Sequence, residues 1–141
     1  MELPIKLEGI LFAKENNFYK FLILKRTLEE GGYWQPLTGT LKDDESVLDC
    51  LYRELEEETG VREPVNLIKD VTTFDFVDKY NRRVLEFVYG VELTLDQKIT
   101  LNPEEHSEYK WVLLDEALEV LKHDSNKNAI KILFKKLGES K

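Results

Sequence analysis

Three glutamates near the middle of the chain have a spacing that could bring their carboxylates together. Glu54, Glu57 and Glu58 stand at positions i, i+3 and i+4, so on a helix they share one side of the cylinder. Like charges at this spacing repel one another and weaken an isolated helix. Carboxylate oxygens are also the ligands that Mg²⁺ and Mn²⁺ prefer. The spacing therefore indicates either a solvated acidic face or a divalent-cation site.

The charge of the chain is concentrated around these glutamates. From Asp43 to Glu58 there is one basic residue, Arg53, against eight acidic residues, which gives this segment a net charge of −7. The whole chain carries a net charge of −8, so the remainder is nearly neutral. We therefore expect a cation to offset the acidic segment.

The residues around the glutamates predict a helix that packs on a core. Gly60 is expected to end this helix with a positive φ angle. Gly39 lies in the loop before the helix, where a glycine allows the backbone to approach a ligand closely. A fixed helix orientation favours the cation site over the solvated face. The apolar stripe that would fix it comprises Val47, Leu48, Leu51, Tyr52 and Leu55.

The stretch from Gly39 to Val61 resembles the signature box of the Nudix hydrolases. All nine specified positions of the box are filled over 23 residues, which makes the match far more specific than a lone glycine motif. The pattern reads Gly39, five residues, Glu45, seven residues, Arg53-Glu54-Leu55, one residue, Glu57-Glu58, one residue, Gly60-Val61.

This resemblance implies a loop–helix–loop that binds a divalent metal, Mg²⁺ or Mn²⁺, and hydrolyses a nucleoside diphosphate linked to another group. Arg53 is implied to orient a box carboxylate, and Glu45 to support the start of the helix. The acceptor of the water proton is implied to be Glu54, Glu57 or a loop acid such as Glu105, and the sequence does not choose among them. The implied metal-binding positions are Gly39, Glu54, Glu57 and Glu58.

The order of elements predicts a single α/β domain over residues 1–141. We expect a mixed β-sheet flanked by helices, which is the α/β/α sandwich that the Nudix resemblance implies. Predicted strands cover residues 5–13, 18–24, 84–93 and 109–114, with one or two more within 65–76 and a polar loop over 94–108. One predicted helix follows Gly39, a second begins at residue 115, and a third spans residues 126–137. The last helix is expected to turn Ala129, Ile130, Ile132, Leu133 and Leu137 inward.

Three residues before the box are candidates for substrate binding. Arg26 ends a predicted strand and could bind phosphate through its planar fork, or simply be a solvated strand end. Trp34 could stack on a base or belong to the core. Thr38 occupies a place where many Nudix members carry a second glycine. The stretch WQPLTGT is similar to the corresponding part of Nudix pyrophosphohydrolases that act on dihydroneopterin triphosphate and deoxynucleoside triphosphates.

A second group of polar residues lies in the predicted loop before the last strand. Glu105 and His106 resemble a region in which some Nudix chains place a further carboxylate. The alternative is a capped, solvated loop. A loop histidine beside carboxylates typically acts as a hydrogen-bonding partner rather than a general base.

The function predicted from these features is metal-dependent hydrolysis of a phosphoanhydride bond in a nucleoside triphosphate-like substrate, with release of pyrophosphate. The substrate would be a (deoxy)nucleoside triphosphate or dihydroneopterin triphosphate. One alternative is a dinucleoside polyphosphate hydrolase acting on diadenosine tetraphosphate. Another is a nucleotide-binding regulatory module without activity, although such modules are expected to lose box carboxylates and this chain keeps them all.

The composition of the chain limits which binding partners and which cellular compartment we expect for the protein. The acidic balance argues against nucleic acid polymers and anionic membranes, which require a basic surface. No segment approaches the roughly 20 apolar residues of a membrane span. The start, Met1–Pro4, lacks the basic residues of a secretory signal, and a single Cys50 cannot form an internal disulfide. We therefore expect a cytoplasmic protein, monomeric or homodimeric, that acts on small molecules.

Overall fold

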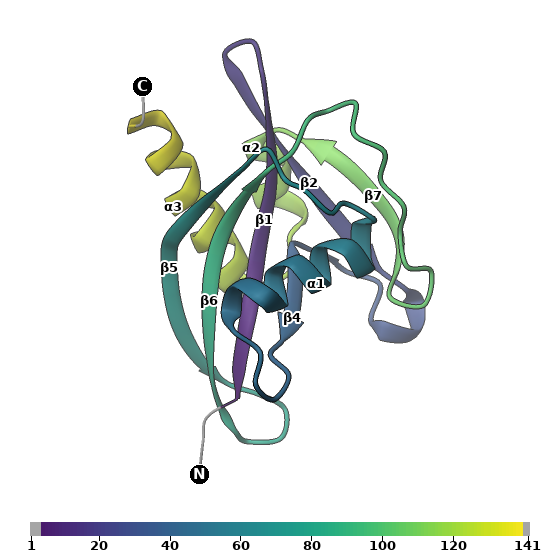
Figure 1. The fold of residues 1–141 in the computed structure, drawn as a ribbon, viewed down its shortest axis with the longest axis vertical. Coiled ribbons are helices and arrows are strands. Elements are labelled where there is room, and N and C mark those ends of the chain that lie inside the picture. The colour runs from purple at the N-terminus through teal and green to yellow at the C-terminus, as the bar shows by residue number, and fades with distance from the viewer. Residues whose placement is uncertain (1–3, 140–141) are drawn as a thin grey trace.

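The computed structural model describes residues 4–139, which form a seven-stranded mixed β-sheet with helices on both faces (Figure 1). Most of Met1–Pro4, on which the absence of a secretory signal was predicted, lies outside this range. The strands are β1 (Ile5–Glu15), β2 (Phe18–Arg26), β3 (Trp34–Gln35), β4 (Leu37–Thr40), β5 (Asn66–Val77), β6 (Arg83–Glu92) and β7 (His106–Val112). The helices are α1 (Val47–Thr59), α2 (Leu114–Val120), α3 (Asp124–Glu139) and a short 3₁₀ turn, η1 (Leu28–Glu30).

Strand β1 is the centre of the sheet, and one of its edges is divided between two partners. Its residues Lys6–Gly9 pair with β4, whereas Leu11–Glu15 pair with β2. The chain passes from β2 to β1 at Pro36, between β3 and β4. The sheet therefore forks at Pro36, with β4 on one branch and β2, β3 and β7 on the other. On its other edge β1 runs parallel to β6, which confirms the predicted mixed sheet.

The two faces of the sheet carry separate cores, because side chains along β1 alternate between them. On one face, Leu7 packs with Leu51 and Leu55 of α1. On the other, Ile10 and Phe12 belong to the cluster that α2 and α3 complete. Figure 1 shows α1 in front of the sheet and α3 behind it. The layered arrangement fixes the side of α1 that can face a ligand.

Several predicted details are corrected by the structure. The prediction of one or two strands within residues 65–76 is confirmed by the single strand β5 (Asn66–Val77), whose register is irregular between Ile68 and Thr72. Strand β7 begins at His106, inside the predicted loop, because it pairs with the end of β2. Ile132 and Tyr52 were expected to face inward but are 37% and 40% exposed, since each lies beside the buried stripe of its helix. Among the described residues, no helix is long and apolar enough to cross a membrane.

Candidate active site

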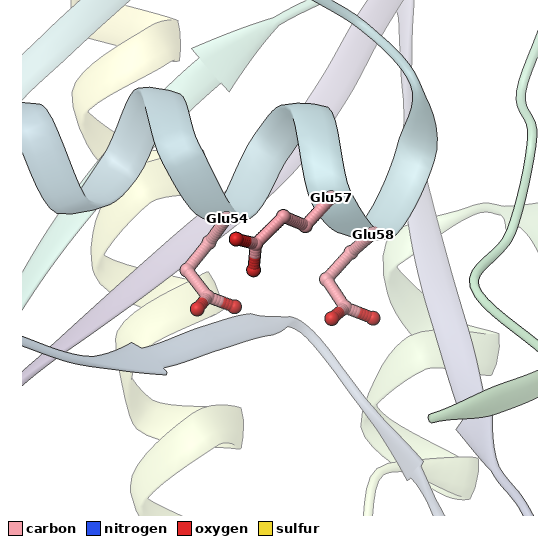
Figure 2. A group of neighbouring side chains, drawn as sticks. All are labelled: Glu54, Glu57 and Glu58. Atoms are coloured by element: carbon pink, nitrogen blue, oxygen red, sulfur yellow. The ribbon is translucent and has the colours of Figure 1, made fainter. Parts of the chain in front are cut away.

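Helix α1 presents the three glutamates on a side set by its caps and its buried face. The Ser46 hydroxyl accepts a hydrogen bond from the Asp49 amide at 3.0 Å and caps the first turn. Gly60 ends the helix with φ +78°, the left-handed conformation that favours glycine. Leu51 and Leu55 are fully buried against the sheet. The remaining side of α1 directs its glutamates over β4 (Figure 2).

Glu54, Glu57 and Glu58 form a compact group of carboxylates. One oxygen from each residue lies within 4.8 Å of the others. The side chains of Glu54 and Glu58 are 13% and 7% exposed, whereas that of Glu57 is 48% exposed. Gly39 on β4 makes room for this group, because a Cβ there would clash with Cγ and Cδ of Glu54. The glycine thus accommodates a neighbouring carboxylate, a requirement that spacing alone did not show.

Arg53 binds two of these three carboxylates and also Glu45. Its Nε and Nη2 donate to the two Glu45 oxygens at 2.7 and 2.9 Å, and its Nη1 donates to Glu54 Oε1 at 2.6 Å. Nη1 also reaches Glu57 Oε2 at 3.4 Å. The guanidinium, with the Lys42 amide, lowers the pKa of Glu45 to about 2. Burial raises the pKa of Glu54, and the hydrogen bond from Arg53 opposes that rise.

Glu58 is held from the opposite side by a buried histidine. His106 Nδ1 lies 2.8 Å from Glu58 Oε2, and its Nε2 lies 2.9 Å from Gln35 Nε2. With Gln35 as donor, the ring accepts at Nε2 and donates its Nδ1 proton to Glu58. Both ring nitrogens are therefore engaged, and His106 has no free nitrogen with which to activate a water.

Two adjoining cavities open at the fork in the sheet. The first, here called the carboxylate cavity, has a volume of about 500 Å³ and is lined by the three glutamates, Arg53 and Glu105 among others. The second, here called the sheet cavity, has a volume of about 390 Å³, and Phe74, Phe76, Glu86 and Asn126 lie in its walls. The two are neighbours because four residues line both: Lys6, Arg26, Gln35 and Thr38.

The predicted substrate-binding residues fall into two groups. Arg26 and Thr38 lie at the junction of the two cavities. The Arg26 Nη2 group lies 2.9 Å from Glu30 and 3.7 Å from Glu105, and its buried Nε has no hydrogen-bond partner among the described residues. Trp34 lines neither cavity; it packs against the α2–α3 core, with the Lys110 ammonium 4.7 Å from its ring centre.

Comparison with known protein families shows which family has this sequence pattern and fold. The NUDIX domain family matches residues 9–134, which include all of α1, β4 and β6 and most of β1. The chain belongs to the Nudix family. The resemblance drawn from the Gly39–Val61 box is thereby confirmed.

Solved Nudix structures share the fold over nearly the whole chain. A Listeria monocytogenes protein assigned to the NUDIX hydrolases superposes with a TM-score of 0.85 at 28% identity, covering 96% of this chain and 95% of its own. An Ap4A hydrolase of C. elegans gives a TM-score of 0.84 at 18% identity, covering 97% and 99%. The E. coli dihydroneopterin triphosphate pyrophosphohydrolase gives 0.76 at 23% identity, covering 90% and 92%. The latter two show the fold alone.

Relatives found by sequence carry several names. An octanoyltransferase of Myxococcus xanthus is 33% identical over 79% of this chain, but the match spans only 31% of that protein. An 8-oxo-dGTP diphosphatase of Proteus vulgaris is 34% identical over 51% of this chain and 63% of its own length. An RNA pyrophosphohydrolase of Pelagibacter ubique is 27% identical over 82% and 80%. The chain thus spans less than two thirds of the first two relatives.

The residues of the Nudix box fit a divalent metal ion. The group offers only oxygen ligands, which suit hard cations such as Mg²⁺ and Mn²⁺. In the part of the chain that the structure describes, Arg53 is the one guanidinium bound to the group, and it is shared with Glu45, so negative charge remains in excess. Glu54, Glu57 and Glu58 are the residues that would hold the ion.

The cavities also contain residues that the sequence analysis did not single out. Lys6 and Gln35 carried no recognisable signal, because neither belongs to a motif. Glu86 was detectable in principle: it interrupts the apolar run VLEFV on β6, as Glu8 interrupts an apolar run on β1. A charged residue at an inward position of a strand is unusual enough to mark a site.

Proposed function

We propose that the chain hydrolyses a phosphoanhydride bond of a nucleoside triphosphate-like substrate, using Mg²⁺ or Mn²⁺ and releasing pyrophosphate. The substrate class is a (deoxy)nucleoside triphosphate or dihydroneopterin triphosphate. The observation that carries the proposal is the glutamate group of α1, which lines a cavity that adjoins a second, partly aromatic one. This arrangement offers one place for phosphates and another for a single head group.

Within this reaction the residues of α1 bind and orient. A divalent ion at this site would polarise phosphate oxygens and lower the pKa of a bound water. Arg53 holds Glu54 through a 2.6 Å hydrogen bond, and His106 holds Glu58 at 2.8 Å. The acceptor for the proton of the attacking water is Glu54, Glu57 or Glu105, all of which line the carboxylate cavity.

Fixed cations at the junction of the cavities would bind the outer phosphates. Arg26 and Lys6 line both cavities. The Arg26 side chain is 20% exposed, so part of its guanidinium can reach an anion in the cavities. Arginine binds phosphate oxygens through two parallel N–H groups, which supports Arg26 as a phosphate-binding residue.

Cavity size supports a short substrate over a two-headed one. The sheet cavity of about 390 Å³ is at the lower end of the range for small-molecule sites, roughly 300 to 1,000 Å³. The alternative substrate, diadenosine tetraphosphate, needs a place for a second base. One surface hollow of about 850 Å³, between η1 and residues 103–108, offers that room and contains none of the three glutamates. Because this hollow could hold a second base, diadenosine tetraphosphate is included among the substrates to be tested.

A substrate panel tests the proposal. The purified chain is assayed at saturating Mg²⁺ with dGTP, dATP, 8-oxo-dGTP, dihydroneopterin triphosphate, diadenosine tetraphosphate and a 5′-triphosphorylated oligoribonucleotide. We expect the highest kcat/KM for a mononucleotide or pterin triphosphate, with pyrophosphate as the product and complete loss of activity on chelation. A tenfold preference for the tetraphosphate, about 1.4 kcal/mol, would establish the alternative. Binding without any hydrolysis, in Mg²⁺ or Mn²⁺, would indicate a regulatory module.

A further inference from the structure

A second carboxyl pair lies inside the protein, away from the Nudix box. Glu8 on β1 is fully buried, and Glu86 on the adjacent parallel strand β6 is only 5% exposed. Asn126, near the start of α3, donates from Nδ2 to Glu8 Oε1 at 2.8 Å. The other oxygen of Glu8 is buried and receives no hydrogen bond from a donor within residues 4–139. A pair of this kind has to be neutralised by a cation or by a proton.

One proton shared between Glu8 and Glu86 would remove the repulsion between the two buried carboxyl groups. Burial raises the pKa of Glu8 well above its usual value, and the neighbouring Glu86 carboxyl raises it further. Burial also raises the pKa of Glu86, while Lys6 opposes the rise. Protonated Glu8 can donate its unpaired O–H to Glu86, which satisfies the orphan oxygen. The pair then carries one proton and one negative charge, with the charge on Glu86.

The charged member of the pair faces a cavity. Glu86 and Asn126 line the sheet cavity, whereas Glu8 lies behind them. Phe74 and Phe76 of β5 line the same cavity, and their ring centres are 6.1 Å apart. The cavity therefore combines aromatic surface with a carboxylate that has lone pairs left to accept hydrogen bonds. Lys6 connects it to the carboxylate cavity.

We propose that the sheet cavity holds the head group of the substrate and that Glu86 selects heterocycles with two adjacent N–H donors on one edge. This edge is the 2-amino-4-oxo unit, in which a ring N–H stands beside an exocyclic amino group, and guanine and pterins share it. The inference rests on the function proposed above and narrows its substrate class.

The selectivity follows from donors and acceptors. A carboxylate only accepts, and it accepts two parallel N–H groups well. Adenine and cytosine place an acceptor beside their amino group, and uracil and thymine flank their ring N–H with carbonyl oxygens. Each of these edges would set an acceptor against the Glu86 carboxylate. Glu8 acts as a positioning residue, because its O–H fixes the orientation of Glu86 without touching the substrate.

The first test uses the wild-type chain and single-atom changes in the substrate. Values of kcat/KM are measured for dGTP, dITP, which lacks the 2-amino group, and dATP. We expect dGTP to exceed both by about tenfold or more, the scale of one bidentate contact. A smaller preference overturns the inference. Dihydroneopterin triphosphate, compared with dGTP in the same assay, identifies which of the two heterocycles is the better substrate.

The second test changes the selecting residue. Glu86→Gln keeps the shape of the side chain but pairs an acceptor with a donor, an arrangement that suits adenine. We expect the dGTP/dATP ratio of kcat/KM to fall by about tenfold or more. The matched control is Glu92→Gln, the same change on the same strand at a residue that lines neither cavity. An unchanged ratio in the Glu86 variant overturns the inference.

A binding measurement separates this inference from the proposed function. Dissociation constants of GMP and AMP are obtained by NMR titration of the wild-type chain without metal, so no hydrolysis is required. If no nucleotide is hydrolysed but GMP binds at least about tenfold more tightly than AMP, the proposed function fails and the inference stands. If nucleotides are hydrolysed and GMP has no such advantage, only the inference fails. This measurement also decides the question should Glu86→Gln not fold.

Discussion

The protein contains two groups of carboxylates that are stabilised in opposite ways. The glutamates of α1 lie at a cavity, where Arg53 binds Glu54 and Glu57 and where their negative charge is not fully offset. The Glu8–Glu86 pair lies within the sheet, and its stabilisation comes from a proton and from Asn126. The first group can accept a metal cation because its charge is retained. The second can recognise hydrogen-bond donors because the one negative charge it retains lies on Glu86, which lines the sheet cavity.

The difference shows how the surroundings of a glutamate set the pKa of its carboxyl group. Glu45 binds a guanidinium, and its pKa falls to about 2. Glu8 is fully buried beside Glu86, and its pKa rises. Identical carboxyl groups thus have their pKa lowered in one region and raised in the other, which favours the anion at Glu45 and the protonated form at Glu8.

The largest effect is expected from breaking the metal-binding group. Glu57→Gln preserves size but removes a charge, so we expect kcat to fall by at least about 10²-fold, the scale of removing one strong transition-state contributor. The control is Glu56→Gln, one residue away on α1, whose carboxylate pairs at the surface with Arg62 at 3.0 Å. The comparison is made by steady-state kinetics in Mg²⁺ free of other metals. Near-wild-type turnover by Glu57→Gln would remove this residue from the catalytic group.

A smaller effect should follow from releasing Glu58. His106→Ala removes the Nδ1 donor and leaves the buried Glu58 carboxylate without its partner. We expect the Mg²⁺ concentration for half-maximal activity to rise by about 10-fold or more, as for other residues that orient metal ligands. The measurement is a Mg²⁺ titration of kcat/KM, with a thermal melt to verify folding. An unchanged Mg²⁺ requirement would show that Glu58 needs no support from His106.

A substitution of Arg53 tests whether this residue orients the box carboxylates or binds the substrate. Arg53→Lys cannot reproduce the paired contacts to Glu45 together with the bond to Glu54. We expect kcat to fall by about tenfold, with a smaller rise in KM, since one charge-assisted hydrogen bond is lost. Arg62→Lys at the surface is the matched control. A rise in KM with kcat intact would place Arg53 among the substrate-binding residues instead.

The smallest effect concerns the stability of the buried pair. Because the pKa of Glu8 is raised on folding, its contribution to stability is full below the unfolded pKa and is lost as pH rises through the folded pKa. Glu8→Gln keeps an acceptor for Asn126 and a donor for Glu86 but does not titrate. We expect the Tm of the wild type to decline more between about pH 5 and about pH 8 than that of the variant. Parallel Tm curves would contradict a shared proton.

The box helix was predictable from sequence because its information is local. Three glutamates within five positions share a helix side through backbone geometry alone, and Ser46 and Gly60 mark the ends of that helix. The same locality revealed most strands, since alternation and apolar runs are properties of a short segment. Predictions became inaccurate where tertiary contacts decided the outcome, as at His106, which pairing with β2 draws into a strand.

The sequence by itself determined the family, the mixed α/β architecture and the group of carboxylates on α1, because each depends on residues close together in the chain. Only the tertiary structure brought Glu8 beside Glu86, set Asn126 against them, and placed His106 between Glu58 and Gln35. These partners are separated by dozens of residues, and nothing in their local sequence specifies the neighbour. Burial then changes what they can do, because enclosure by the sheet and α3 raises the pKa of the Glu8 carboxyl well above its usual value.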